Sequence, residues 1–247
     1  GYESRGVRIR GVLEALGPIF VKFGQILSTR RDFIPGDIAE ELSRLQDDVP
    51  PFAGEEARKL IEKAYGCEVS EIFLDFDENP IASASIAQVH GATLRDGTQV
   101  IVKVVRPDIE PTITQDVSLM NLMASLLERY WEPAAKLKLS LVVAEVEKTI
   151  FDELDMFREA ANASQLSRNF ENSTKLCVPK VFWDYTCDNI LVIEKVVGLN
   201  ISDRDALIKA GVDLKTLAVT GVDILFTQIF RDHFFHADIH PGNIFII

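Results

Sequence analysis

An aspartate and an asparagine near the end of the sequence stand at a spacing that is used in phosphoryl transfer. Asp238 and Asn243 are five positions apart in the segment HADIHPGN. At this spacing the aspartate can orient or deprotonate an attacking hydroxyl, and the amide oxygen of the asparagine can hold Mg²⁺. The structural alternative is an Asx-type turn ahead of Pro241 and Gly242. We therefore treat Asp238 as a candidate catalytic residue and Asn243 as a candidate metal ligand.

The same segment also permits a different metal-binding interpretation. His236, Asp238 and His240 occupy alternate positions, so on an extended strand their side chains would point to one side. A zinc site would need further ligands, and only His90 and His233 remain as additional imidazoles. The phosphoryl-transfer interpretation is therefore preferred.

A lysine in the middle of an apolar run is the next candidate. Lys103 lies within VIVKVV, and an ammonium group buried on such a strand would need an anionic partner. Three acids in the helical segment EKTIFDELDMFREAANA are possible partners, namely Glu153, Asp155 and Glu159. In phosphoryl-transfer sites of this kind a strand lysine binds the α- and β-phosphates and pairs with a helix glutamate. The alternatives are an outward-facing lysine and acids that form ordinary surface ion pairs.

The first part of the chain should be helical. Apolar residues recur at helical spacing over 7–31, and Gly17-Pro18 divides this stretch into two helices or one kinked helix. Two more helical segments follow, so roughly the first 66 residues are expected to be helices. Six arginines and lysines against two glutamates in 1–31 predict either a solvated face or a docking surface for anionic lipid or an acidic partner.

The middle of the chain changes to β-rich sequence. The runs 86–94 and 98–105 are joined by Arg95-Asp96-Gly97, a strong hairpin signal. Beyond them the pattern predicts helices and strands in the following order: a helix over 107–130, a second long helix over 139–170, short strands over 178–186 and 189–197, a possible hinge at Gly198, a helix stopped by Gly211 and an apolar helix over 213–230.

The charge, apolar runs and cysteine content of the 247-residue chain exclude several classes of protein. A net charge of −12 argues against a general nucleic-acid binder. No stretch is apolar for the roughly 18 to 20 residues that a membrane span needs, and no signal-peptide pattern opens the chain. The three cysteines have no metal-ligand spacing, which favours free thiols in a reducing compartment. We expect a soluble segment.

Taken together, these motifs resemble the UbiB family of atypical protein-kinase-like proteins, which is tied to ubiquinone (coenzyme Q) biosynthesis. The resemblance runs from LGPIFVKFGQILSTRRDFIP through ASASIAQVH, VIVKVVRP and DELDMFREAANA to FFHADIHPGNIF. It implies an α+β protein-kinase-like fold with an N-terminal helical extension and an incomplete C-terminal lobe. The implied domains are an extension over 1–66, an N-lobe with inserted helices over 67–197 and the start of the C-lobe over 198–247.

The resemblance also implies roles for single residues. Lys22 and Gln25 match the KxGQ signature of a helical extension that folds over the active site and occupies the usual protein-substrate groove. Glu153 and Asp155 match the ExD signature, and these four residues are the implied regulatory set. Glu159 matches the helix glutamate that pairs with Lys103. The catalytic set is then Asp238, Lys103 and Glu159, with Asn243 as the metal ligand.

Alanine takes the place of glycine in the implied nucleotide loop. The implied nucleotide-binding residues are Ala82, Ser83, Ala84, Ser85, Ile86, Lys103, Glu194 and Asn243. Alanine forbids most of the positive-φ conformations that glycine allows. A stiffer and bulkier loop should alter the preference between ADP and ATP and make phosphoryl transfer to proteins poor.

The implied function is that of an atypical kinase or ATPase that uses ATP and Mg²⁺ and supports ubiquinone biosynthesis. ATP hydrolysis or phosphorylation of a small lipid is expected, with ubiquinone-biosynthesis enzymes or lipid intermediates as partners. One alternative is a nucleotide-binding, non-catalytic scaffold for those enzymes at the membrane. Another is a small-molecule phosphotransferase similar to antibiotic kinases, against which Lys22 and Gln25 argue.

One departure from the family pattern concerns the second metal ligand. A DFG-like aspartate should follow the catalytic loop, and the sequence ends at Ile247, shortly after Asn243. The family's remaining C-terminal lobe and its hydrophobic membrane anchor are likewise expected beyond this chain. With them, the full-length protein is expected at the cytoplasmic face of the bacterial inner membrane.

Overall fold

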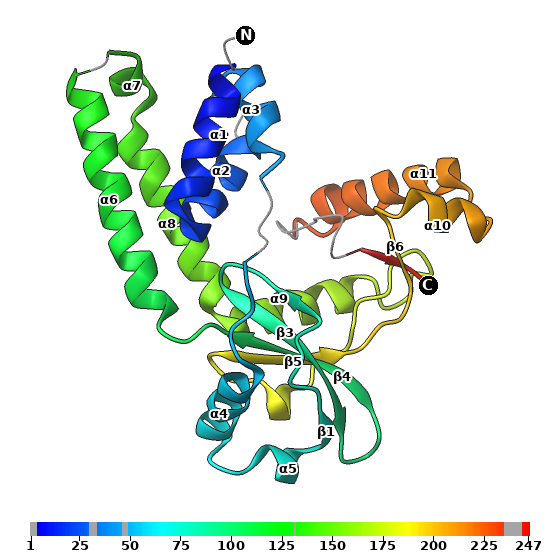
Figure 1. Cartoon of the computed structure of the whole chain (residues 1–247). Coiled ribbons are helices and arrows are strands. Elements are labelled where there is room, and N and C mark those ends of the chain that lie inside the picture. Colours follow the sequence, from blue (N-terminus) through cyan, green and yellow to red (C-terminus); the bar gives the residue numbers. More distant parts are fainter. Residues whose placement is uncertain (1–3, 30–33, 46–48, 131, 235–243) are drawn as a thin grey trace.

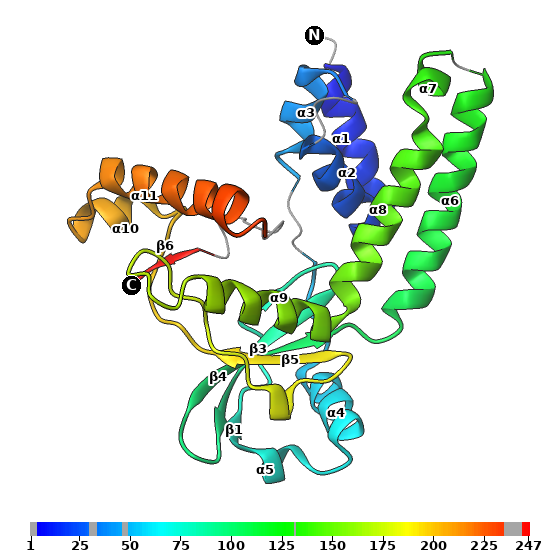
Figure 2. The same cartoon turned by 180° about the vertical axis from the view of Figure 1, so that it is seen from behind.

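The computed structural model describes residues 4–29, 34–45, 49–130, 132–234 and 244–247. Figure 1 shows a small sheet with helices on both sides, a group of long helices that extends away from it, and a further pair of helices near the C-terminus. The same layers are seen from behind in Figure 2, where α9 lies across the sheet. Helices and strands thus form separate layers, as an α+β fold requires.

The sheet is antiparallel throughout. Its strands are β1 (Phe73–Phe76), β2 (Ala82–Ser83), β3 (Ala87–Leu94), β4 (Gln99–Val105) and β5 (Ile190–Glu194). Neighbours follow the order β1-β3-β4-β5, and β2 pairs with β3. The predicted β3–β4 hairpin is confirmed, and its turn needs Gly97 because φ there is +89°.

Each face of the sheet belongs to a different hydrophobic core. Val100, Val102 and Val104 are fully buried on one face, where Ile61 of α4 (Gly54–Tyr65) packs against them. The short helix α5 (Val69–Ile72) completes this core. Leu191 of β5 belongs to the other core, which is shared with the long helices. Alternation of the strand residues therefore gives two distinct faces, as the period of a strand demands.

Two long helices and four shorter ones pack on one another beside the sheet. They are α1 (Arg5–Leu16), α2 (Pro18–Thr29), α3 (Gly36–Leu42), α6 (Ile109–Tyr130), α7 (Glu132–Leu137) and α8 (Leu139–Leu154). The predicted break at Gly17 is confirmed, with φ of +117°. Figure 1 shows α1 and α2 beside α8, with α3 on their far side, whereas α4 lies beside the sheet. The expected all-helical stretch at the start of the chain is therefore divided between two cores.

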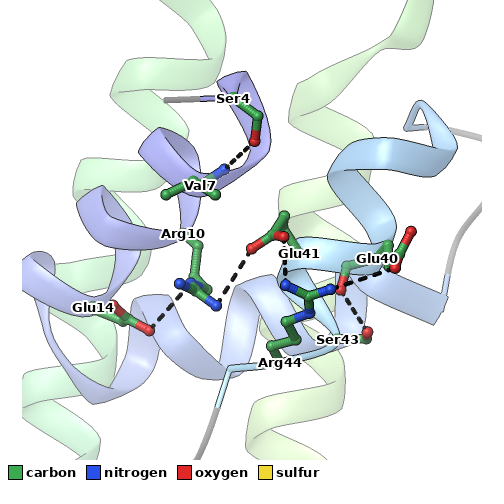
Figure 3. Close-up of polar contacts among 8 residues, drawn as sticks. All are labelled: Ser4, Val7, Arg10, Glu14, Glu40, Glu41, Ser43 and Arg44. Atoms are coloured by element: carbon green, nitrogen blue, oxygen red, sulfur yellow. Dashed lines mark hydrogen bonds and ion pairs between the residues drawn. The ribbon is translucent and has the colours of Figure 1, made fainter. Parts of the chain in front are cut away.

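Ion pairs neutralise much of the charge on the first helices. Nη1 of Arg10 on α1 lies 3.3 Å from Oε2 of Glu41 on α3, and Arg44 approaches the same glutamate from the other side (Figure 3). Arg5 pairs with Asp37 at 2.9 Å. Because α3 supplies acids to the basic helix α1, Arg5 and Arg10 form ion pairs within the protein. The surface of the first helices is therefore less cationic than the sequence suggests.

The expected single helix over 139–170 is wrong. The chain breaks at Asp155, where φ is −80° and ψ is 94°, and a new helix α9 (Met156–Asn169) begins there. The Asp155 carboxylate caps α9 by accepting from the main-chain N–H of Arg158 at 2.9 Å. The main-chain N–H of Met156 donates to the carbonyl of Asp188 at 3.3 Å, which ties the break to a distant turn.

The expected strand over 178–186 is also wrong. Only an isolated bridge joins Val181 to Ile193, and a 3₁₀ turn (Trp183–Tyr185) follows. After the sheet come β6 (Leu199–Asn200), α10 (Arg204–Lys209), α11 (Leu214–Phe226), a π-helical turn (Thr227–Arg231) and β7 (Phe245–Ile246). β6 pairs with β7. Among the described residues, no helix is both long and apolar enough to span a bilayer.

Candidate functional site

Lys103 and Glu159 are brought together across the sheet and α9. Nζ of Lys103 on β4 lies 2.6 Å from Oε2 of Glu159 on α9. Their side chains are 30% and 35% exposed, so the pair is reached by solvent from one side. Val102 and Val104, on either side of Lys103, are fully buried on the opposite face. The lysine is therefore neither an outward surface residue nor sealed in the core.

The break at Asp155 determines where Glu159 lies. Because Asp155 is the N-cap of α9 and not a helical residue, Glu159 stands in the first turns of a new helix that contacts β5. The expectation that Glu153, Asp155 and Glu159 lie in one helical segment is therefore wrong, because they fall in α8, at the break and in α9. The described role of Asp155 is to cap α9.

The helical extension reaches the same region through a second lysine. Nζ of Lys22 on α2 lies 2.6 Å from Oε2 of Glu153, which is one residue before the end of α8. Gln25 lies one turn further along α2 and donates from Nε2 to the carbonyl of Leu45 at 3.2 Å. Lys22 thus links the extension to the acids beside the break, whereas Gln25 holds the chain that leaves α3.

Gly24 of α2 allows this helix to pack closely against Leu13 and Leu45, and it was not among the site residues expected from the sequence. A Cβ on Gly24 would lie 2.4 Å from Cδ1 of Leu45 and 2.8 Å from Cδ1 of Leu13. The available signal was a small residue on the apolar side of a helix, next to Lys22 and Gln25.

The alanine-rich loop forms a tight connection between β2 and β3. Ser83 pairs with Gln88, and the main-chain N–H of Ala84 donates to the carbonyl of Ala87 at 2.9 Å. The side chains of Ser85 and Ile86 are buried, and Ile86 joins the core of the long helices. Any contact of this tip with a ligand would therefore come mainly from its backbone.

The alanines also follow a spacing that sequence analysis did not note. Ala82, Ala84 and Ala87, followed by Val89, stand where the G-x-G-x-x-G-x-V pattern of a kinase loop has its three glycines and its valine. Val89 is directly opposite Lys103 in the β3–β4 register. The loop and the lysine are consequently presented on the same part of the sheet.

The sheet face that carries Lys103 is only partly covered. Val89, Gly91, Ile101 and Ile193 share this face and are half-buried, unlike the fully buried valines of the other face. A cavity of about 170 Å³ continues along the same row, where Gly91, Thr93 and Gln99 line it together with the acids Asp75 and Asp77. A half-covered apolar row beside a lysine suits a flat base that is attached to phosphates. A larger cavity of about 360 Å³ lies elsewhere, between the end of α9 and α11.

Of the predicted site residues that remain, the structure describes Glu194 but not Asp238 or Asn243. Glu194 ends β5, and its carboxylate accepts from the main-chain N–H of Lys180 at 3.3 Å. Asp238 and Asn243 lie outside the described residues, as do His236 and His240. Within the described ranges, no three His, Cys, Asp or Glu residues cluster as a metal site.

A buried histidine behind the loop is held by a complete set of hydrogen bonds. Nδ1 of His90 lies 2.9 Å from the carbonyl oxygen of Asp77, so this nitrogen must be the donor. Nε2 of His90 then accepts from Nε2 of Gln88 at 2.9 Å. Gln88 also bonds the main-chain N–H and carbonyl of Phe52. The network requires a neutral imidazole.

We expect His90 to make stability depend on pH. Burial lowers the pKa of His90 from its ordinary value of 6.5, opposed by the Asp77 carbonyl and by the Asp77 and Glu78 charges. The unfolded chain takes up this proton near pH 6.5 while the folded protein resists it, so this contribution is complete above pH 6.5 and is lost as the pH falls below it. Its slope is at most about 1.4 kcal/mol per pH unit.

Thermal unfolding of the full-length protein between pH 5 and pH 8 tests this expectation. His90→Gln keeps a donor and an acceptor but does not titrate, so its Tm should fall less steeply on acidification than that of the wild type. Equal slopes in the two proteins would contradict the role of His90.

Comparison with known proteins identifies close relatives. A family model described as the ABC1 atypical kinase-like domain matches residues 44–247. A protein of Marinobacter nauticus named "Probable protein kinase UbiB" is 60% identical over 243 residues, which are 98% of this chain and 44% of that protein. A protein of the same name from Aeromonas salmonicida is 56% identical over 244 residues, 98% of this chain and 45% of that protein. The chain thus spans less than half the length of these curated relatives.

A solved structure supports the fold. The structure of Rv3197 from Mycobacterium tuberculosis in complex with erythromycin matches with a TM-score of 0.65 and 27% identity, over 96% of this chain and 59% of that one. Together with the family model, this likeness confirms the predicted α+β kinase-like fold.

Proposed function

Because this chain belongs to the ABC1 family of atypical kinase-like proteins, we propose that it binds a magnesium nucleotide beside Lys103 and supports ubiquinone biosynthesis. The relatives named UbiB support the link to that pathway. The proposed reaction is ATP hydrolysis or phosphorylation of a small lipid, carried out by the full-length protein. Ubiquinone-biosynthesis enzymes or lipid intermediates at the cytoplasmic face of the inner membrane are the proposed partners.

The observation that carries the proposal is the Lys103–Glu159 pair. An ammonium group has three donors, and the contact with Glu159 at 2.6 Å uses one of them. Since the pair is about one-third exposed, the remaining donors can reach a phosphate that approaches from the open side. Glu159 keeps the lysine in this position before a ligand arrives, which lowers the cost of ordering it on binding.

The described residues fit a nucleotide at both of its ends. The half-buried row that includes Val89 and Ile101 offers an apolar surface to the base, and Lys103 offers positive charge to the phosphates. A bound Mg-nucleotide supplies the transferable phosphoryl group, with Mg²⁺ offsetting its negative charge. Asn243 would hold the metal, and Asp238 would orient the attacking oxygen and accept its proton.

The extension supports a small acceptor in preference to a protein. Lys22 binds Glu153, six residues before Glu159, so α2 is attached next to the nucleotide-binding pair. A helix held there would occupy the space in which a protein substrate lies in an ordinary kinase. Water or a small lipid hydroxyl needs far less room.

The test uses the full-length protein with and without Mg-ATP and Mg-ADP. Ligand at 100 times its Kd should stabilise the fold by about 2.7 kcal/mol, seen as a rise in Tm. Release of phosphate should accompany binding of Mg-ATP and should be lost in Asp238→Asn. Binding without turnover that depends on Asp238 would indicate a nucleotide-binding scaffold, and no rise in Tm with either nucleotide would reject the proposal.

A further inference from the structure

We propose that Arg106 is a positioning residue for nucleotide binding, which fixes the alanine-rich loop in one conformation without touching the ligand. Arg106 follows directly after β4, three residues beyond Lys103. The strand that presents the phosphate-binding lysine therefore also carries the residue that holds the loop. The inference rests on the proposed function of this site.

Arg106 contacts the loop through both its main chain and its side chain. Its main-chain N–H donates to the carbonyl of Ile86 at 2.9 Å. Its guanidinium donates from Nε to the carbonyl of Ala84 at 2.7 Å and from Nη2 to Oγ of Ser83 at 2.6 Å. A planar guanidinium reaches two acceptors at fixed angles, which a single ammonium group cannot reproduce.

The same guanidinium joins the loop to the segment that leads from the extension to α4. Nη2 also donates to the carbonyl of Pro50 at 3.0 Å, and the guanidinium carbon lies 5.6 Å from the centre of the Phe52 ring. The main chain of Phe52 is bonded on both its N–H and its carbonyl by Gln88 of β3. The loop is thus attached to a segment that is itself attached to the sheet.

The loop needs such support because its own backbone is ordinary. Positive φ at non-glycine residues is found, among the described residues, at Asp108, Lys138 and His233, none of which lies in the loop. A loop of alanine and serine in common conformations has only its own Ala84–Ala87 hydrogen bond and its pairing with β3 to select one arrangement of its carbonyls. Hydrogen bonds from Arg106 strengthen that selection, and Ile86 adds its burial in the core.

The inference predicts that Arg106 controls nucleotide affinity. Calorimetric titration of the full-length protein with Mg-ADP and Mg-ATP should give a Kd for Arg106→Lys about tenfold higher than that of the wild type, equivalent to about 1.4 kcal/mol. Ser83→Ala removes one acceptor and should weaken binding less. In the double variant the two effects should not add, because both remove the same contact.

Hydrogen exchange distinguishes loop positioning from general loss of structure. Amides of 82–87 and those of Phe52 and Ala53 should exchange faster in Arg106→Lys without ligand, while the β4–β5 pairing stays protected. The matched control is Arg44→Lys, which alters an exposed arginine paired with Glu40 and Glu41 and should leave the Kd unchanged.

The outcomes separate this inference from the proposed function. If the wild type binds nucleotide, Lys103→Ala does not, and Arg106→Lys binds as tightly as the wild type, the inference about Arg106 is wrong and the site is right. Tighter binding by Arg106→Lys would also overturn it. If the wild type binds neither nucleotide, the proposed function fails, and the exchange of 82–87 alone then decides whether Arg106 holds the loop.

Discussion

Replacing Lys103 with alanine is expected to weaken binding of Mg-ATP and Mg-ADP to the full-length protein at least 100-fold, or about 2.7 kcal/mol. The ammonium group is the positive charge that the site offers to the phosphates, and its removal leaves the Glu159 carboxylate without the partner that lies 2.6 Å away. A free carboxylate at this position would repel the nucleotide. The expected loss is therefore larger than that of one hydrogen bond.

Calorimetric titration measures this effect, and the chain contains a matched control. Lys59 pairs with Glu55 at 2.7 Å on the exposed side of α4. Lys59→Ala removes a similar ion pair outside the site and should leave nucleotide affinity unchanged. Glu159→Gln keeps an acceptor for Lys103 but removes its charge, so a smaller loss is expected. Binding of Mg-ATP by Lys103→Ala with wild-type affinity would contradict the proposed site.

Replacing Gly54 with alanine should destabilise the protein by about 2–4 kcal/mol, at or above the usual range for overpacking. A Cβ at Gly54 would lie 2.0 Å from the carbonyl oxygen of Glu78 and 2.7 Å from its carbonyl carbon. Because these are main-chain atoms, α4 or the turn that contains Glu78 must shift. Arg58 of α4 also pairs with Glu78, so the shift would disturb a second contact.

Denaturant unfolding of the full-length protein tests this, with Gly11→Ala as the control. Gly11 lies in the interior of α1, and a Cβ there would meet no atom within 4 Å. Alanine at Gly11 should therefore raise stability by about 0.5–1 kcal/mol, since it favours the helix. A Gly54→Ala protein as stable as the wild type would show that α4 can move away from the turn without cost.

Local patterns in the sequence were sufficient for the β3–β4 hairpin and for the division of the first helices at Gly17. Alternating valines with a turn sequence between them depend on near neighbours only, so the hairpin could be predicted. The break at Asp155 could not be, because apolar residues continue at helical spacing through Leu154 and Phe157. The main-chain contact between Met156 and Asp188, far along the chain, helps to hold that break.

The candidate site, too, could be predicted only in part from the sequence. Lys103 and Glu159 were expected as partners from motifs, and the structure brings them into contact. Arg106 was not singled out, although it stands in the quoted motif, because its importance depends on Ala84 and on Pro50, which is 56 positions away. An arginine after a strand carries no signal of what it will bind. The strand expected over 178–186 is limited to the bridge between Val181 and Ile193, because the chain enters a 3₁₀ turn at Trp183.

The two lysines of this site are attached on either side of one interruption in the helical chain. Lys22 binds Glu153 just before Asp155, and Lys103 binds Glu159 just after it. The two contacts therefore end on the short stretch of chain in which α8 gives way to α9. Thermodynamic linkage makes any effect of one contact on the other reciprocal. If a ligand that strengthens or loosens the attachment of the extension also turns α9, it must change nucleotide affinity, and nucleotide must change that attachment to the same extent. A molecule that bound the extension and turned α9 would therefore change nucleotide affinity from a distance.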